Sequence, residues 1–266
     1  MLFTPLFVCA QFWEVGVMLG GSAYDGDLTP GLIDMKQINP AGGVIVRANI
    51  SKYVTIKGNV YDGTISGDDK DATNPKNLNR NLSFTSNILD IGINCEYNLT
   101  GFVANDRHNS TSPYLFAGLA VFSFDPRAYD NVSGQWVRLQ PLGTEGQNTA
   151  RYNDNGHNKY ALTQISIPFG IGLKHNFSRN WNLGLEFGLR KTFTDYLDDV
   201  SNTYVSYDYL AAESGPLAAR MSNRTLNKDL TLTDNTLRGN PNKDDWYMFG
   251  GIIISYTFLA PICYRF

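Results

Sequence analysis

Cysteine, net charge and long apolar runs are all scarce in this sequence, and each shortage excludes a class of protein. Three cysteines in 266 residues are too few for a disulfide scaffold. The formal net charge is only −3 and no stretch is strongly basic, so no nucleic-acid partner is expected. Apolar runs such as 252–254 are far shorter than the roughly 20 residues that a membrane-spanning helix needs. A helical membrane protein is therefore excluded.

Alternation of apolar and polar residues is the abundant feature, and a period of two is typical of strands. Residues 180–193 read NWNLGLEFGLRKTF, with apolar side chains at most odd positions. The even positions place Glu186 and Arg190 beside Gly184 and Gly188, which suits a crowded interior rather than a solvated face. We expect lipid to cover the apolar face and the polar face to line a narrow barrel. A soluble barrel would show the opposite arrangement.

The same pattern recurs along the chain and predicts strands at about 12–24, 42–50, 54–61, 89–97, 113–124, 164–174, 180–193 and 246–258. Both faces of the strand from Pro113 are apolar, so its facing stays open. Compact connections near 51, 99–112 and 176–180 alternate with long polar ones at 25–38, 63–81, 125–158 and 195–244. Short periplasmic turns and long external loops are typical of bacterial outer-membrane barrels. The sequence thus predicts an all-β, eight-stranded antiparallel up-and-down transmembrane β-barrel with long extracellular loops.

Four acids and four bases fall on the predicted inward faces. They are Glu14, Arg47, Lys57, Asp90, Glu96, Lys174, Glu186 and Arg190. Because an unpaired buried charge costs several kcal/mol, we expect a bridged, partly hydrated network that plugs the lumen. A selective ion path is the alternative, and a barrel of this size disfavours it. Four aromatic residues near strand ends, Trp13, Tyr97, Trp181 and Trp246, are expected to form the membrane girdle.

The two ends of the chain are expected to lie outside the barrel domain at 11–258. Residues 1–10 combine an apolar stretch with a small-residue pattern ending at Ala10, which indicates the remnant of a signal peptide. An ordinary buried first strand is the alternative interpretation. Residues 259–266 are predicted to form a periplasmic tail.

Enzymatic, cofactor and metal sites are not expected. A lipid-modifying enzyme would need a nucleophile beside a base, yet His108, His157 and His175 fall in separate connections or strand ends. The acidic groups at 68–71 and 195–199 lack calcium-loop spacing, so we expect them to be solvated.

Several stretches carry a family resemblance: LQPLGTEGQNTARY, IPFGIGLKHNF, LGLEFGLRKTFTDYLDDVSNTY and DDWYMFGGI. Together they resemble the PorG-like outer-membrane barrels of the Bacteroidota type IX secretion system, over about residues 13–258. The resemblance implies a non-enzymatic barrel that associates with a periplasmic ring lipoprotein and its partner protein to support secretion. No catalytic residues come with it, and residues 143–147 and 193–201 are expected to order the loops.

A periplasmic docking face is the functional prediction. The predicted connection at 99–112 is long for a periplasmic turn and lies beside the tail, and aromatic and Arg side chains are frequent interface anchors. The predicted contact residues are Asp106, Arg107, His108, Tyr264, Arg265 and Phe266. The alternative is a small structural or adhesive barrel, similar to OmpA or OmpX, whose long loops meet external ligands.

Overall fold

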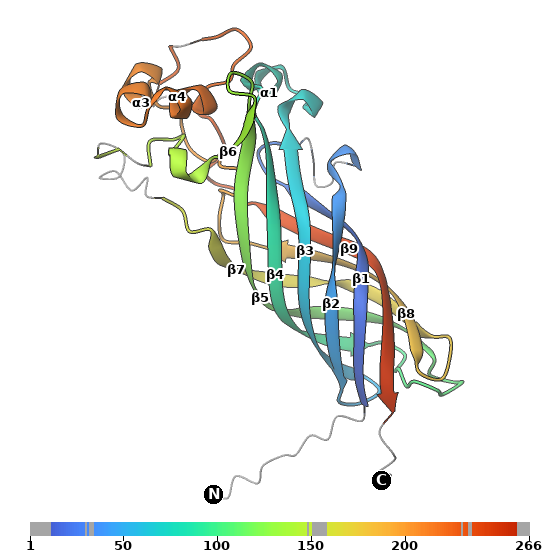
Figure 1. The fold of residues 1–266 in the computed structure, drawn as a ribbon. Coiled ribbons are helices and arrows are strands. Elements are labelled where there is room, and N and C mark those ends of the chain that lie inside the picture. The colour runs from blue at the N-terminus through green and yellow to red at the C-terminus, as the bar shows by residue number, and fades with distance from the viewer. Residues whose placement is uncertain are drawn as a thin grey trace, which may run out of the picture.

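The computed structural model describes residues 12–29, 31, 35–147, 149–150, 159–229, 231–233 and 236–259. These residues form one antiparallel sheet that closes on itself into a barrel (Figure 1). Its strands are β1 Phe12–Asp25, β2 Asn39–Asn49, β3 Val54–Asp68, β4 Ser83–Asn98, β5 Thr111–Asp130, β6 Gln135–Arg138, β7 Thr163–Asn176, β8 Trp181–Lys191 and β9 Trp246–Leu259.

Closure of the barrel depends on the pairing of its first and last strands. β1 pairs with β9 from Phe12 opposite Leu259 to Asp25 opposite Trp246, and every other neighbouring pair is also antiparallel. β6 pairs only with the outer end of β5, so eight of the strands make the barrel wall. The predicted eight-stranded antiparallel barrel is confirmed.

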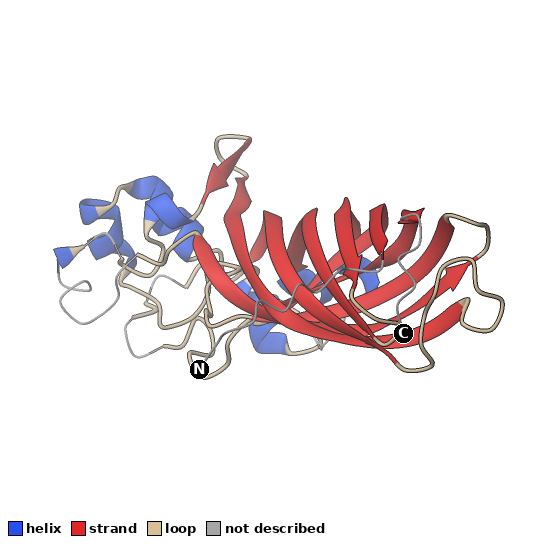
Figure 2. Cartoon of the chain, turned by 90° about the horizontal axis from the view of Figure 1, so that it is seen from below, coloured by secondary structure: helices blue, strands red, loops and turns tan. Residues whose placement is uncertain are grey.

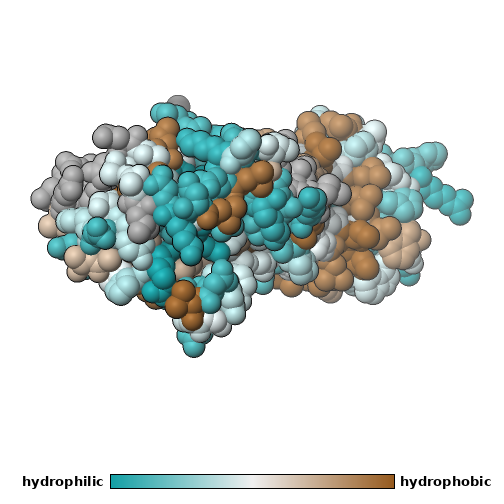
Figure 3. Space-filling view, turned by 90° about the horizontal axis from the view of Figure 1, so that it is seen from above, coloured by the Kyte–Doolittle hydropathy of each residue, from teal (hydrophilic) through white to brown (hydrophobic). Residues whose placement is uncertain are grey.

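Side-chain exposure alternates along the part of the wall that carries the exposed apolar residues. In β1, for example, Val15 and Val17 are 45% and 47% exposed, whereas Glu14 and Met18 are buried inside. Exposed apolar side chains on all eight wall strands form a belt around the barrel, while the external loops are largely hydrophilic (Figure 3). Such a belt matches the hydrocarbon layer of a bilayer.

The fifth predicted strand, β5, can now be assigned its facing. Leu119 and Val121 are exposed to the outside, and Phe122 and Phe124 are buried inside the barrel. Aromatic side chains fill this part of the interior, which explains why both faces of the strand are apolar.

Strands extend beyond the belt, so the external loops begin later than predicted. β3 continues to Asp68 and β5 to Asp130, where residues 63–68 and 125–130 were expected to be loop. The remaining external connections contain short helices that the sequence did not predict: α1 Pro75–Arg80, α3 Tyr207–Glu213 and α4 Pro216–Ser222. They gather at one end of the barrel (Figures 1 and 2). None of the helices in the described part of the chain is long and apolar enough to span a membrane.

Candidate functional site

The charged residues of the lumen meet in one buried network. Arg47 lies at its centre, with Nη1 2.7 Å from Glu14 Oε1, Nε 3.0 Å from Glu96 Oε1 and Nη2 3.8 Å from Glu186 Oε2. Lys57 Nζ lies 2.5 Å from Glu186 and 3.5 Å from Glu96. Glu96 and Glu186 each pair with more than one base and Glu14 pairs with Arg47, so the charges of this group largely compensate one another.

The three remaining members of the predicted set lie in the same lumen. Lys174 Nζ donates to Glu96 Oε2 at 2.8 Å. Arg190 lies farther up the barrel, where its Nε is 3.8 Å from Asp90 Oδ2. Asp90 also accepts a hydrogen bond from the Tyr247 hydroxyl at 2.8 Å. All eight predicted residues are thus placed inside the wall, in a six-residue group and a separate pair.

Tyrosine hydroxyls complete the network, and sequence reasoning missed their role. Tyr114 and Tyr61 donate to the two carboxylate oxygens of Glu186 at 2.7 and 3.1 Å. Alternation identified Tyr61 as inward-facing, whereas Tyr114 belongs to β5, whose facing was open. Buried polar side chains and tyrosines fill this part of the lumen, as expected for an eight-stranded barrel.

The periplasmic opening is covered by the connection between β4 and β5. Phe102 is fully buried, its backbone N–H donates to Lys52 O at 2.7 Å, and its ring lies 5.3 Å from Lys174 Nζ. The Asn105 N–H donates to the side chain of Asn176 at 3.0 Å, which fixes the connection to the next turn. Phe102 is a second residue that the sequence pattern did not single out.

The predicted partner-binding residues divide into two groups. Arg107 and His108 are exposed on this connection, while the carboxylate of Asp106 is occupied by His108 N–H at 2.9 Å and Asn109 Nδ2 at 2.8 Å. The other three, Tyr264, Arg265 and Phe266, lie outside the described residues. Among the described residues, Arg107 and His108 are therefore the two predicted anchors whose side chains are exposed to a partner.

Aromatic side chains mark both ends of the apolar belt. Trp13, Tyr97 and Trp181 are about half exposed at the periplasmic end, where Trp181 packs against Tyr256 with ring centroids 5.3 Å apart. Trp246 lies at the external end of β9, and its ring contacts Lys191 Nζ at 5.1 Å. This placement matches the two interfaces of a bilayer.

Over the external mouth, the two resemblance stretches 143–147 and 193–201 pack together with the loop helices α1, α3 and α4 and with the segment that precedes β9. We call this whole external structure the cap. Glu145 is its hub, because its carboxylate accepts the backbone N–H groups of Ser201 and Asn202 at 2.9 and 3.1 Å. Arg238 Nη1 donates to the same carboxylate at 3.0 Å. The predicted loop-ordering role of these stretches has a clear structural basis in these contacts.

Three of the acids that were expected to be solvated, Asp69, Asp198 and Asp199, are buried, whereas Asp68, Asp71 and Asp195 are partly exposed. Asp69 receives two hydrogen bonds from Arg80, at 2.8 and 2.7 Å. Asp199 accepts from Thr144 and Tyr160 at 2.5 and 2.7 Å. The partners of Asp199 come from distant segments and that of Asp69 from a later part of its own loop, so the spacing of the acids alone did not indicate their burial. In the part of the chain that the structure covers, no cluster of potential ligands is arranged to hold a metal ion.

Burial changes the protonation of several cap acids. It raises the pKa of Asp195 to about 8, with further repulsion from the nearby acids Asp27 and Glu145. Burial also raises the pKa of Asp199 to about 6, against the attraction of Arg238. The folded cap therefore binds protons that an unfolded loop would release near neutral pH.

The two histidines that the structure describes both lie at the periplasmic end of the barrel. His175 Nδ1 pairs with the Thr111 hydroxyl at 2.7 Å at the periplasmic end of the barrel, and His108 is exposed on the connection nearby. His157 lies outside the described residues.

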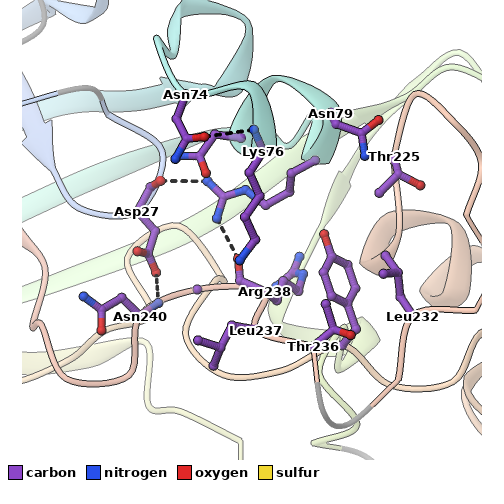
Figure 4. Close-up of a pocket in the computed structure, with 14 residues that line it drawn as sticks. Asp27, Asn74, Lys76, Asn79, Thr225, Leu232, Thr236, Leu237, Arg238 and Asn240 are labelled. Atoms are coloured by element: carbon purple, nitrogen blue, oxygen red, sulfur yellow. Dashed lines mark hydrogen bonds between the residues drawn. The ribbon is translucent and has the colours of Figure 1, made fainter.

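A polar pocket of about 270 Å³ opens in the cap (Figure 4). Asp27 and Asn240 lie on one side of it, Asn79 and Thr225 on the other, and Lys76 extends between them. Asp27 Oδ2 accepts the Asn240 N–H at 2.9 Å. This pocket faces the external side and is distinct from the lumen network.

A closed barrel with an apolar outer belt, paired charges inside and a folded external cap is a transmembrane β-barrel of the bacterial outer membrane. The chain belongs to the family described as Domain of unknown function (DUF6089), which it matches over residues 1–137 and 143–216. The predicted location is confirmed, and contact with outer-membrane lipid follows from it.

Several solved structures are similar. The attachment invasion locus protein Ail of Yersinia pestis shares 8% identity, over 93% of this chain and 99% of that chain, with a TM-score of 0.43. Neisserial surface protein A (NspA) shares 9% identity, over 92% of this chain and 97% of that chain, with a TM-score of 0.44. The N-terminal β-barrel domain of Pseudomonas aeruginosa OprF shares 11% identity, over 92% of this chain and 97% of that chain, with a TM-score of 0.37. No curated protein matches the chain.

Proposed function

We propose that this chain is a non-enzymatic outer-membrane barrel that acts through its cap, by binding ligands outside the cell as small structural or adhesive barrels do. The observation that carries the proposal is the buried core of the cap, centred on Glu145 and Arg238. A loop that served only to connect strands would not need fully buried ion pairs, which are costly to desolvate. The filled lumen makes transport a weaker explanation.

The test is to replace residues 207–222, which contain α3 and α4, with a flexible linker. Cells that display the wild-type chain in the outer membrane should adhere to surfaces coated with extracellular glycoconjugates, and cells with the replacement should not. Replacing the exposed turn at 131–134 is the matched control and should leave adhesion intact. Equal adhesion by all three, with barrels that keep their heat-modifiable gel mobility, would reject the cap as the functional site.

A second candidate is the secretion role that the sequence resemblance implies, with a periplasmic ring lipoprotein and its partner protein as the binding partners. The ordered β4–β5 connection favours the secretion role. Buried Phe102 anchors this connection to the barrel, and Arg107 and His108 are exposed on it. Deleting the whole connection would also remove Phe102, so the sharper variant is Arg107→Ala with His108→Ala.

This double variant should lose co-purification with the ring proteins and reduce secretion. Lys52→Ala, in the neighbouring β2–β3 turn, is the control. Normal co-purification and secretion by the double variant would count against docking through this connection.

A further inference from the structure

The cap pocket is rich in side chains that could hydrogen-bond to a ligand. Asn77, Asn79, Tyr204 and Thr236 line it, and within the described residues their side-chain polar atoms make no hydrogen bond to the protein. Tyr204 is otherwise buried, so its hydroxyl is held at the pocket wall by the packing of its ring. Amides and hydroxyls can each both donate and accept.

The two arginines in the wall are already engaged by acceptors of the protein. Arg80 uses Nε and Nη2 on Asp69, and its Nη1 donates to Arg238 O at 2.6 Å. Arg238 donates to Glu145 Oε1, to the Asp199 carbonyl and to the Ser222 carbonyl. An anion would have to compete with these internal acceptors, so the arginines do not make the pocket an anion site.

Besides the two arginines, the pocket has one positively charged and one negatively charged side chain, Lys76 and Asp27. Lys76 is exposed and has no carboxylate partner in the described part of the chain, and Asp27 supplies the opposite charge across the pocket. Leu232 and Leu237 add apolar surface. The pocket is thus close to neutral, with free amides and hydroxyls beside short apolar patches.

We propose that this pocket binds a single ring of a neutral sugar. A sugar ring presents hydroxyls that both donate and accept, together with apolar C–H faces, and the free groups of the pocket match both. The volume of about 270 Å³ lies just below the range of roughly 300–1,000 Å³ for drug-sized ligands, which suits one ring rather than a long chain. The inference rests on the proposed function and specifies its ligand class.

The test uses the full chain in detergent micelles, with glucose, galactose, mannose and N-acetylglucosamine as probes in saturation-transfer NMR. At least one sugar should receive saturation, and titration should give a dissociation constant. Tyr204→Phe and Asn79→Ala should each weaken binding about three- to tenfold, the effect of one lost hydrogen bond. Asn131→Ala, on the exposed turn between β5 and β6, is the matched control and should bind as the wild type does.

Lys76→Gln separates neutral from anionic ligands. Sugar binding should persist in this variant, because no charge is needed. If instead only sulfate or phosphate binds and Lys76→Gln abolishes it, or if no probe binds, the sugar assignment is overturned. The proposed adhesive function fails separately, through unchanged adhesion after replacement of 207–222.

Discussion

Arg238 and Glu145 are 93 positions apart in the chain, yet Nη1 of the arginine donates to Oε1 of the glutamate at 3.0 Å with both side chains buried. The pair joins the external connection between β6 and β7 to the external connection between β8 and β9. Each partner also binds backbone groups of the 199–202 segment, Arg238 at the Asp199 carbonyl and Glu145 at the Ser201 and Asn202 amides. One ion pair therefore holds two external loops in a single structure.

Glu145→Gln should loosen the cap while the barrel stays folded. The substitution leaves Arg238 buried without its main counter-charge, and breaking a buried pair typically costs about 3–5 kcal/mol. Backbone amides of 199–202 should exchange hydrogen faster, whereas those of β1 to β4 should not change. Hydrogen-exchange mass spectrometry measures both. Unchanged protection at 199–202 would show that the pair does not hold the cap.

Raising the pH should also loosen the cap. Burial raises the pKa of Asp195 to about 8, whereas an unfolded chain has a value of about 3.9. The proton is therefore held more tightly in the folded cap, so its stabilisation is complete below about pH 3.9 and is lost as the pH rises through about 8. Limited proteolysis of the 195–244 loop should be slow at pH 6 and faster at pH 9.

Asp195→Asn should reduce this pH dependence, because the amide does not ionise. Asp208→Asn, at an exposed position in the same loop, is the control. If both variants show the same pH dependence as the wild type, another group controls the loop.

Arginine at a lipid-facing position should be destabilising in a depth-dependent way. Leu185 is 53% exposed in the middle of β8, so Leu185→Arg should cost about 2–4 kcal/mol, while Phe177→Arg in the periplasmic turn should cost about 0–1 kcal/mol. Denaturant unfolding from lipid vesicles gives both free energies of unfolding. Equal costs would contradict the assigned membrane position.

The barrel should conduct little current. Charged side chains and tyrosines occupy the lumen, and Phe102 covers its periplasmic opening. Purified protein in planar bilayers should show no large, stable porin-like conductance. A steady conductance that disappears on substitution of Arg47 or Arg190 would favour the channel alternative.

Arg47→Met should destabilise the barrel by about 3–5 kcal/mol, because Glu14 and Glu96 would lose their main partner. The double variant Arg47→Met with Glu14→Gln should recover part of this loss. Additive losses in the two single variants and the double variant would mean that the residues do not interact energetically.

The barrel wall could be predicted from the sequence because side chains that face lipid are apolar and side chains that face the lumen are mostly polar or charged. This difference appears in the sequence as alternation. β8 shows it clearly, with Leu185 and Phe187 outside and Glu186 and Arg190 inside. The contrast disappears in β5, where Phe122 and Phe124 face an interior that is itself aromatic. Its facing could be decided only when the neighbouring strands were in place.

The cap could not be predicted because its order comes from contacts between distant segments. Asp199 is buried by Thr144, Tyr160 and Arg238, none of which is near it in the sequence. Helices α3 and α4 have seven residues each, which is too short for a clear helical period. The pocket could not be predicted either, because its walls come from α1 and from the β8–β9 connection, which are far apart in the sequence.

The lumen network also has a consequence for how the barrel assembles. Glu14 on β1 accepts at Oε1 from Arg47 on β2 and from Ser255 on β9, so its carboxylate has both hydrogen bonds only once the first and last strands have paired. A partly closed sheet would expose such charges to hydrocarbon, where each unsatisfied group costs several kcal/mol. The ion pairs therefore penalise half-inserted intermediates and make zipping of the β1–β9 seam the step that commits the chain to the membrane.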